Sequence, residues 1–261
     1  MKPDLDQLAR QQLVDYDTAC PGLVFAEPEF DLTVPEAYEL QFKVASLRQL
    51  RGESVAGYKV GCVSPAVQGQ LGLNQPLFGH IFDTEVYRSE VSLDHNRFHQ
   101  LAIEGEFAFR MAEDGPDAGW LAANAQHAIE AAFVVIELHN FCCRAPAGKR
   151  AQELIANNGM HAGVVLPEKE GRFRSADELL DEKISVLCDG VVLGAATGRA
   201  LPAGPLASLI FLVEQLRKIG KSLGRGQIVL AGSSLPLYRA EPGDRFEVNC
   251  DRLPRVRARI L

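Results

Sequence analysis

The 261-residue chain has no surplus of positive charge and no long apolar run. Its 27 Lys and Arg face 34 Asp and Glu, for a formal net charge of −7, so no surface for nucleic acid or an anionic membrane is expected. The longest clean apolar stretch, 206–213 with only Ser208 breaking it, is far below the roughly 20 residues that span a bilayer. The opening Met-Lys-Pro-Asp-Leu-Asp does not resemble a secretory signal, so a cytoplasmic location is expected.

Cysteine is also sparse. Six cysteines without CxxC spacing indicate neither a disulfide scaffold nor a zinc site, and we expect reduced thiols. The adjacent Cys142 and Cys143 would point to opposite faces of a strand and bridge poorly.

What the chain has is enough apolar sequence, 47% of its residues, to bury a substantial core. No repeat or linker divides it, so we expect a single structural unit with an N-terminal helical arm at 1–55 and a catalytic domain at 56–261. Apolar spacing predicts helices at 5–16, 35–50, 65–71, 121–131, 150–156 and 205–219. Strands are predicted at 57–63, 102–111, 132–141, 161–166, 184–188, 191–197, 228–231, 245–250 and 256–260, which together indicate an α+β fold.

Two glutamates share one face of the strand predicted at 102–111. A period of two places Ile103, Phe107 and Phe109 on one side and Glu104 and Glu106 on the other. Like charges pointing the same way indicate either a solvated polar edge or a site for a divalent cation.

Glu137 favours the metal hypothesis. It interrupts the apolar run Ala132-Phe133-Val134-Val135-Ile136, and an ionised carboxylate buried there needs a basic side chain or a metal as partner. Three carboxylates suit Mg²⁺ or Mn²⁺ better than zinc.

A series of motifs runs in order along most of the chain. It comprises Gly57-Tyr58-Lys59-Val60-Gly61, Ser64-Pro65-Ala66-Val67-Gln68, the segment 70–79, Glu104 with Glu106, Glu137, Ala156-Asn157-Asn158, the segment 228–232 and Glu241-Pro242-Gly243-Asp244. This series resembles the 2-oxopent-4-enoate hydratase and 4-oxalocrotonate decarboxylase branch of the fumarylacetoacetate hydrolase superfamily. The resemblance implies a strand-rich mixed β-roll of the fumarylacetoacetate hydrolase C-terminal type behind the helical arm, and a homo-oligomer.

The resemblance also implies the site. Glu104, Glu106 and Glu137 would bind Mg²⁺ or Mn²⁺, and Lys59 would be the catalytic cation beside the substrate. Charge arithmetic agrees, because three glutamates exceed a divalent ion by one negative charge and would repel an anionic substrate without a nearby lysine.

The implied function is a metal-dependent lyase that hydrates a short 2-hydroxydienoate or 2-oxo-enoate in aromatic meta-cleavage catabolism. Leu77 stands where hydratases of the family commonly carry an acidic residue, and this favours the alternative of a 4-oxalocrotonate-type decarboxylase, which needs no water activation. An acylpyruvate C–C hydrolase is a further alternative, although no histidine precedes His80. A noncatalytic partner subunit is the last, and the retained Lys59 and glutamates argue against it.

Three further residues are candidates for contact with an anionic 2-oxo acid. His139 would share the strand face of Glu137, where the family usually has an apolar residue, and is interpreted as a core side chain, a support for the ligands or a proton donor. His80, which is expected in a loop after Gly79, could replace the acid missing at Leu77, and Ser233 could donate to a substrate carboxylate from a turn at a strand end. A complex with another enzyme of the same pathway is also considered.

Overall fold

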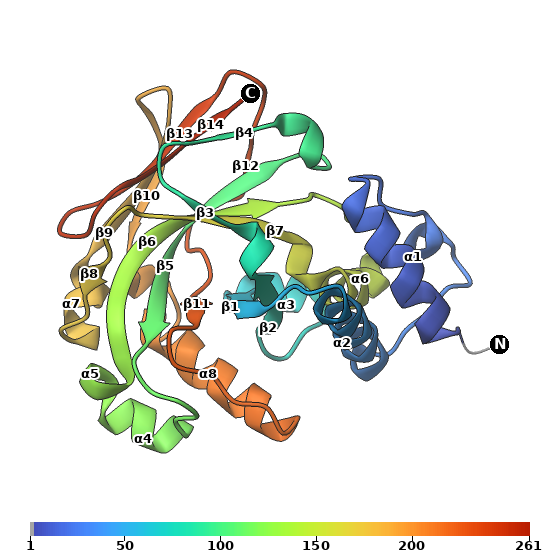
Figure 1. The fold of residues 1–261 in the computed structure, drawn as a ribbon, viewed down its shortest axis with the longest axis horizontal. Helices are drawn as coiled ribbons and strands as arrows, with labels where there is room; N and C mark the ends of the chain where they lie inside the picture. Colours follow the sequence, from blue (N-terminus) through green and yellow to red (C-terminus); the bar gives the residue numbers. More distant parts are fainter. Residues whose placement is uncertain (1–2) are drawn as a thin grey trace.

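The computed structural model describes residues 3–261 as two sheets with helices along one side and one end (Figure 1). A nine-stranded sheet curls through the centre, and a five-stranded sheet packs across part of it. This is the expected α+β, strand-rich architecture. Among residues 3–261, no helix has the length and apolar character needed to cross a bilayer.

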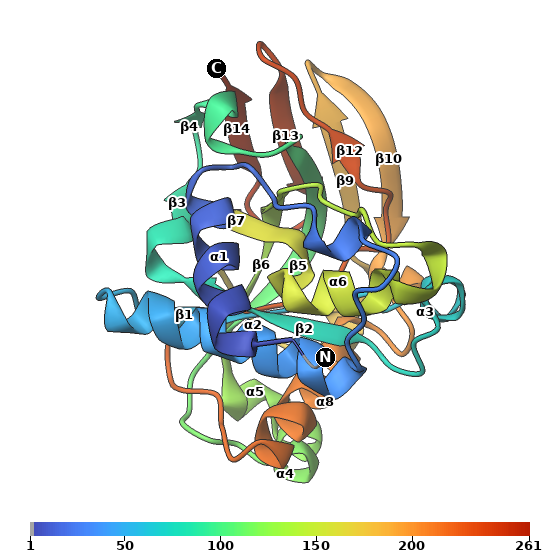
Figure 2. The same ribbon diagram turned by 90° about the vertical axis from the view of Figure 1, so that its right-hand side faces the viewer.

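The N-terminal helices form the layer nearest the viewer in Figure 2. In α1 (Leu5–Asp17), the Asp4 side chain accepts hydrogen bonds from the first backbone N–H groups, and α2 (Val34–Leu50) begins with a capping box of Thr33 and Glu36. Both helices confirm the sequence prediction to within one residue at each end. α2 packs on α1 and on α6 (Arg150–Ala156), and these helices cover one side of the larger sheet.

The nine-stranded sheet contains the functional residues. Its order is β2 (Leu77–Phe82), β1 (Val55–Gly61), β11 (Ile228–Leu230), β5 (Ala102–Met111), β6 (Ile129–His139), β7 (His161–Leu166) and β3 (Val86–Arg88), with β12 (Tyr238–Arg239) beside β5 and β8 (Gly171–Arg172) beside β6. Parallel pairing joins β1 to β11 and β3 to β7, and the other pairs are antiparallel. β1 and β11 approach so closely that a Cβ on Gly57 would stand 2.0 Å from the Ile228 carbonyl oxygen.

The second sheet decides which way the glutamates of β5 point. It consists of β10 (Val191–Thr197), β9 (Lys183–Cys188), β13 (Arg245–Cys250), β14 (Val256–Ile260) and β4 (Val91–Leu93). A Cβ on Gly105 would lie 2.7 Å from a Val186 methyl, so this face of β5 meets the second sheet directly. Strand alternation then turns Glu104 and Glu106 to the opposite face, away from the apolar core between the sheets.

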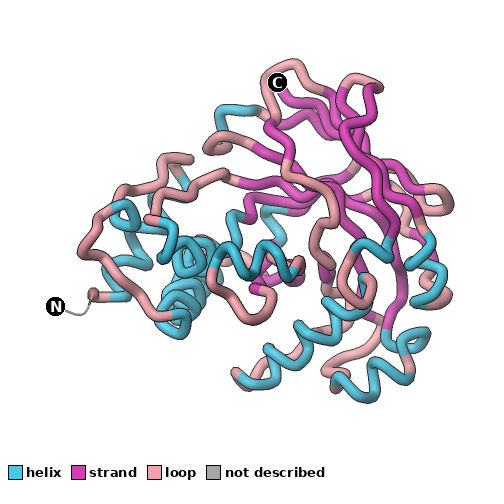
Figure 3. Tube along the Cα trace, turned by 180° about the vertical axis from the view of Figure 1, so that it is seen from behind, coloured by secondary structure: helices cyan, strands magenta, loops and turns pink. Residues whose placement is uncertain are grey.

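The remaining helices are α3 (Pro65–Leu71), α4 (Ala118–Ala123), α5 (Ala125–Ala128), α7 (Ala176–Asp181) and α8 (Pro205–Lys218). Seen from behind, the strands form a continuous body with helices below and to one side (Figure 3). The helix predicted at 121–131 is wrong in its second half, because the chain breaks at Asn124 and enters β6 at Ile129. The run from Ile129 pairs with β5, and this pairing outweighs its local helical spacing.

Candidate metal centre and active site

Three carboxylates meet on one face of β5 and β6. Glu104 lies directly opposite Glu137 in the antiparallel ladder, and Glu106 is two residues further along the same face. Glu106 and Glu137 are buried, whereas the side chain of Glu104 is 20% exposed and forms the solvent-facing side of the cluster. The ladder register therefore brings together the three glutamates that the sequence singles out.

Lys59 completes the cluster from β1. Its side chain is buried, and its Nζ lies 3.1 Å from Glu137 Oε1. Burial alone lowers the pKa of Lys59, but the carboxylates of Glu137, Glu106 and Glu104 outweigh it and hold that pKa above its ordinary value. A Cβ on Gly61 would stand 3.2 Å from the ammonium, so this glycine leaves room for the lysine end group.

Two histidines flank Glu137. His161, the first residue of β7, places Nδ1 2.7 Å from Glu137 Oε1. His139 places Nε2 3.5 Å from Glu137 Oε2 and 3.2 Å from Glu104 Oε2. The sequence analysis missed His161, because only the β6–β7 register, which sets it opposite His139, reveals that it faces the same cluster.

Glu106 and Glu137 respond to this environment in opposite directions. Burial and then the charges of Glu137 and Glu104 raise the pKa of Glu106 well above its usual range. Burial also acts to raise the pKa of Glu137, but Lys59, His139 and His161 outweigh it and hold that pKa well below the usual range. The Gly232 backbone N–H donates to Glu106 Oε2 at 2.8 Å, a contact that the sequence analysis did not identify.

The cluster has the composition of a divalent-cation site. Ligand atoms of Glu104, Glu137 and His139 all lie within 4.8 Å of one another. Glu137 Oε2 is buried and accepts no hydrogen bond from residues 3–261. A buried carboxylate oxygen without a donor is costly. A hard cation would satisfy this oxygen and would also offset the repulsion from Glu137 and Glu104 that, together with burial, raises the pKa of Glu106.

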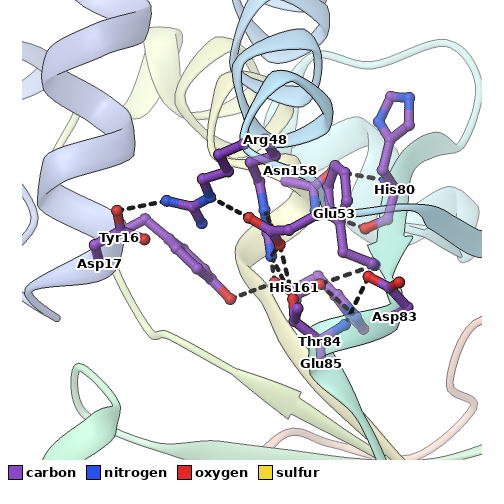
Figure 4. A network of polar contacts seen from close by, with 12 residues as sticks. Tyr16, Asp17, Arg48, Glu53, His80, Asp83, Thr84, Glu85, Asn158 and His161 are labelled. Carbon is purple, nitrogen blue, oxygen red and sulfur yellow. Dashed lines mark hydrogen bonds and ion pairs between the residues drawn. The ribbon is translucent and has the colours of Figure 1, made fainter.

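His80 lies elsewhere. It belongs to the buried strand β2, whereas the sequence placed it in a loop, and its ring packs among Phe42, Tyr58 and Phe82. The Asn158 side chain accepts from the His80 backbone N–H and donates to its carbonyl, as Figure 4 shows. The structure does not bring His80 to the carboxylates.

The burial of His80 predicts a pH dependence of stability. Desolvation lowers its pKa from 6.5 to about 4, so folding favours the neutral ring. A depressed folded-state pKa gives stability that is complete above pH 6.5 and is lost as the pH falls toward 4. The expected loss is about 3 kcal/mol, measured by urea unfolding between pH 7 and pH 4.

His80→Phe is the matched variant for this prediction. It keeps an aromatic ring in the cluster of Phe42, Tyr58 and Phe82 and removes the titrating group. Its unfolding free energy should vary less between pH 7 and pH 4 than that of the unmodified protein. An equal slope in both proteins would contradict the assignment to His80.

Leu77 and Ser233 are both near the cluster, but the Ser233 hydroxyl already has hydrogen-bond partners in the protein. Leu77 is buried, and a Cβ on Gly159 would stand 3.1 Å from Leu77 Cδ1 and 2.7 Å from Lys59 Cε, so both side chains border one point. Ser233 Oγ is 3.3 Å from the Gly105 carbonyl and 3.0 Å from that of Leu235. The Ser233 hydroxyl is therefore engaged in hydrogen bonds to the backbone of its own turn and of β5.

A polar network connects the cluster to the helical arm. Arg48 forms ion pairs with Glu53 and Glu85, and Tyr16 donates to Glu85 (Figure 4). His161 Nε2 lies 3.9 Å from Glu85 Oε2, whereas its Nδ1 faces Glu137. α1 and α2 therefore contribute to the surroundings of the candidate centre, although they supply none of its carboxylates.

A cavity of about 340 Å³ lies on the helical side of His161. It is bordered by α1, α2 and α6, and its lining includes Tyr16, Arg48 and Arg144 as well as His161. None of the three clustered carboxylates lines it. The chemistry of the carboxylate cluster, rather than the size of this cavity, therefore defines the candidate site.

Comparisons with known proteins agree with the fold. No model of a known protein family matches the chain. The 2-keto-4-pentenoate hydratase of Burkholderia vietnamiensis is 30% identical over 222 residues, which cover 85% of this chain and 84% of that protein. A structure of 4-oxalocrotonate decarboxylase from Pseudomonas putida G7, complexed with magnesium and adipate, matches with a TM-score of 0.85 over 98% of this chain and 97% of that one, at 21% identity.

A more distant structural match has the same fold. Fumarylpyruvate hydrolase from Pseudomonas aeruginosa, in complex with Mn²⁺ and pyruvate, gives a TM-score of 0.62 at 16% identity and covers 78% of this chain and 88% of that one. The chain belongs to the hydratase and decarboxylase branch of the fumarylacetoacetate hydrolase superfamily, as its motif series implies.

Proposed function

We propose that the protein is a divalent-metal-dependent lyase that hydrates a short 2-hydroxydienoate or 2-oxo-enoate produced in the breakdown of aromatic rings. The observation that carries this proposal is the buried pair of Lys59 and Glu137 inside a cluster with Glu104 and Glu106. The similarity to 2-keto-4-pentenoate hydratases supports the same reaction class.

The glutamates are the proposed ligands. Glu104, Glu106 and Glu137 would hold Mg²⁺ or Mn²⁺, the ions named for the related structures. A cation bound there supplies a Lewis acid that polarises the carbonyl of a 2-oxo acid. Because Glu104 is the partly exposed member of the set, the substrate would reach the cluster from its side.

Lys59 has two proposed roles. Its ammonium offsets the one negative charge by which three carboxylates exceed a divalent ion, so that an anionic substrate is not repelled. Its Nζ, fixed against Glu137, is also a donor that stabilises negative charge developing on the substrate oxygen. The raised pKa of Lys59 keeps this group cationic at neutral pH.

Decarboxylation of a 4-oxalocrotonate-like dianion is the second candidate, and Leu77 is the observation that favours it. Leu77 borders the same point as Lys59, at a place where an acidic side chain could hold a proton. Leucine cannot do so, and loss of CO₂ requires charge stabilisation but no water activation.

The two reactions are separated by product mass. The purified protein is incubated with a panel of 2-oxo-enoates and 2-hydroxydienoates, with and without EDTA. A product heavier by one water identifies hydration, and a product lighter by one CO₂ identifies decarboxylation. The proposal fails if neither product forms. It also fails if EDTA does not lower the rate of product formation and excess Mg²⁺ added afterwards does not raise it.

Leu77→Asp is expected to raise hydration relative to decarboxylation. The new carboxylate would lie beside Lys59 Cε and could hold the proton that water activation requires. The measurement is the ratio of the two products on one substrate. Leu77→Asn is the matched control, since it is polar but cannot accept a proton at neutral pH, and an equal ratio in both variants would contradict the role of the carboxylate.

We also infer a homo-oligomer, supported by the edge strand β10. Val191, Val192 and Leu193 are 65%, 58% and 40% exposed in succession on this strand, which has a free edge in the second sheet. Val192→Lys is expected to lower the molar mass measured by light scattering during size-exclusion chromatography. Leu50→Lys, at an 84% exposed position on α2, is the control that should leave it unchanged.

The division into a helical arm at 1–55 and a catalytic domain at 56–261 remains a proposal. β1 begins at Val55, which supports a boundary there. The Arg48–Glu85 ion pair and the hydrogen bond from Tyr16 to Glu85 tie the two parts together and support a single structural unit.

A further inference from the structure

His139 is a buried imidazole without a hydrogen-bond partner. Its side chain is 2% exposed, and neither ring nitrogen makes a hydrogen bond of acceptable geometry to residues 3–261. Nε2 nevertheless lies 3.2 Å from Glu104 Oε2 and 3.5 Å from Glu137 Oε2. The ring is close to both carboxylates without being aligned on either of them.

The neighbouring His161 shows the alternative arrangement. It is equally buried, but its Nδ1 makes a 2.7 Å hydrogen bond to Glu137 Oε1, as expected for a histidine that supports a carboxylate. His139 makes no such bond. His139 Nε2 lies close to Glu104 Oε2 and Glu137 Oε2 without a hydrogen bond to either. This is the arrangement expected when all three atoms coordinate one central ion.

The spacing agrees with this interpretation. Adjacent ligands of an octahedral ion at about 2.1 Å stand about 3 Å apart. The two distances from His139 Nε2 are close to that value, and the ligand atoms of His139, Glu104 and Glu137 lie within 4.8 Å of one another. Glu106 lies two residues from Glu104 on the same face of β5, interacts with Glu137 and accepts a hydrogen bond from the Gly232 N–H.

We propose that His139 Nε2 is a direct ligand of the divalent cation, so that the centre combines carboxylates with one imidazole. This inference rests on the proposed function for the presence of the cation. A neutral imidazole adds a donor without adding charge, and it suits Mn²⁺ and the later first-row metals better than Mg²⁺. The ligand set therefore predicts a preference for Mn²⁺ over Mg²⁺.

Electron spin-echo envelope modulation on the Mn²⁺-loaded protein tests the ligand directly. The unmodified protein should show the ¹⁴N modulation of a coordinated imidazole, and His139→Leu should lose it. His127→Leu, which removes an exposed histidine on α5, is the control and should leave the signal unchanged. Because His161 is present in every sample, the difference between the unmodified protein and His139→Leu isolates the coordinated nitrogen.

Metal affinities give a second readout that does not depend on activity. Titration calorimetry should show that His139→Leu weakens Mn²⁺ binding by about tenfold or more, with a smaller effect on Mg²⁺. His139→Gln restores a donor in the form of an amide oxygen and should shift the preference toward Mg²⁺. Thermal unfolding of the metal-free variants confirms that each is folded.

The outcomes separate this inference from the proposed function. Mn²⁺ binding without ¹⁴N coordination, or an unchanged Mn²⁺-to-Mg²⁺ affinity ratio in His139→Leu, overturns the ligand assignment and leaves the lyase proposal standing. Failure of the unmodified protein to bind any divalent cation overturns both. A ¹⁴N signal that disappears in His139→Leu together with a lowered ratio supports the inference.

Discussion

Glu106→Gln is expected to abolish metal-dependent turnover while leaving the fold intact. Gln has the shape of the protonated carboxyl that the metal-free environment of Glu106 already favours, and its amide can keep the contacts to Glu137 and Gly232 N–H. It lacks the negative charge that a divalent ligand supplies. Loss of groups that only support a ligand changes metal affinity by about 10- to 100-fold, so loss of a direct ligand should weaken Mn²⁺ binding at least as much.

The pH dependence of the stability of Glu106→Gln is a second test, independent of activity. A folded-state pKa raised above the unfolded value gives stability that is present below the unfolded pKa and is lost as the pH rises through the folded one. Metal-free Glu106→Gln escapes this loss, so its melting temperature should exceed that of the unmodified protein by a margin that grows with pH. Thermal scans with and without MnCl₂ measure both effects. An active variant that is insensitive to metal would remove the chelation model.

Lys59→Met is expected to impair both catalysis and stability. Loss of one fixed donor at a site of developing charge lowers kcat by about 10²- to 10³-fold. The substitution also leaves Glu137 buried with only histidine partners, and removal of one member of a buried ion pair costs about 3–5 kcal/mol. Steady-state kinetics and urea unfolding of the metal-free protein measure the two losses.

Added metal should distinguish the two roles of Lys59. Mn²⁺ supplies positive charge to the carboxylates, so it should recover part of the stability of Lys59→Met but little of its kcat. Lys183→Met, on the exposed start of β9, is the control and should change neither quantity. Full kinetic recovery with excess Mn²⁺ would show that Lys59 acts only through the charge of the cluster.

Local pattern predicted the elements whose alternation or helical spacing is regular. β5, β7, β10, β13 and β14 have the predicted bounds, as does α3. β2 was not predicted, because its sequence follows Gly-Leu-Asn-Gln-Pro and is buried on both faces, so it has no alternation of polar and apolar residues. Tertiary pairing, which no local window contains, also set the start of β6 at Ile129.

The same distinction applies to the candidate site. Glu104 and Glu106 share a face because of strand period alone, and burial of Glu137 follows from its apolar run. The contributions of His161 and Gly232 depend on β7 and on the turn after β11, which reach β6 and β5 only in the folded chain. The motif series located Lys59, but its 3.1 Å contact with Glu137 needed the sheet order. The sequence was thus sufficient to identify the charged residues of the site, whereas their contacts with one another depend on the pairing of the strands.

The turn at Asn158, Gly159 and Met160 has a consequence for exchange of segments between relatives. All three residues have positive φ, and Gly159 passes so close to Lys59 that a methyl group there would meet the lysine side chain at 2.7 Å. A chimaera that takes β1 from one relative and this turn from another would combine a lysine and a turn whose close packing has not been matched. The two segments, about a hundred residues apart in the chain, should therefore be inherited and engineered as one unit.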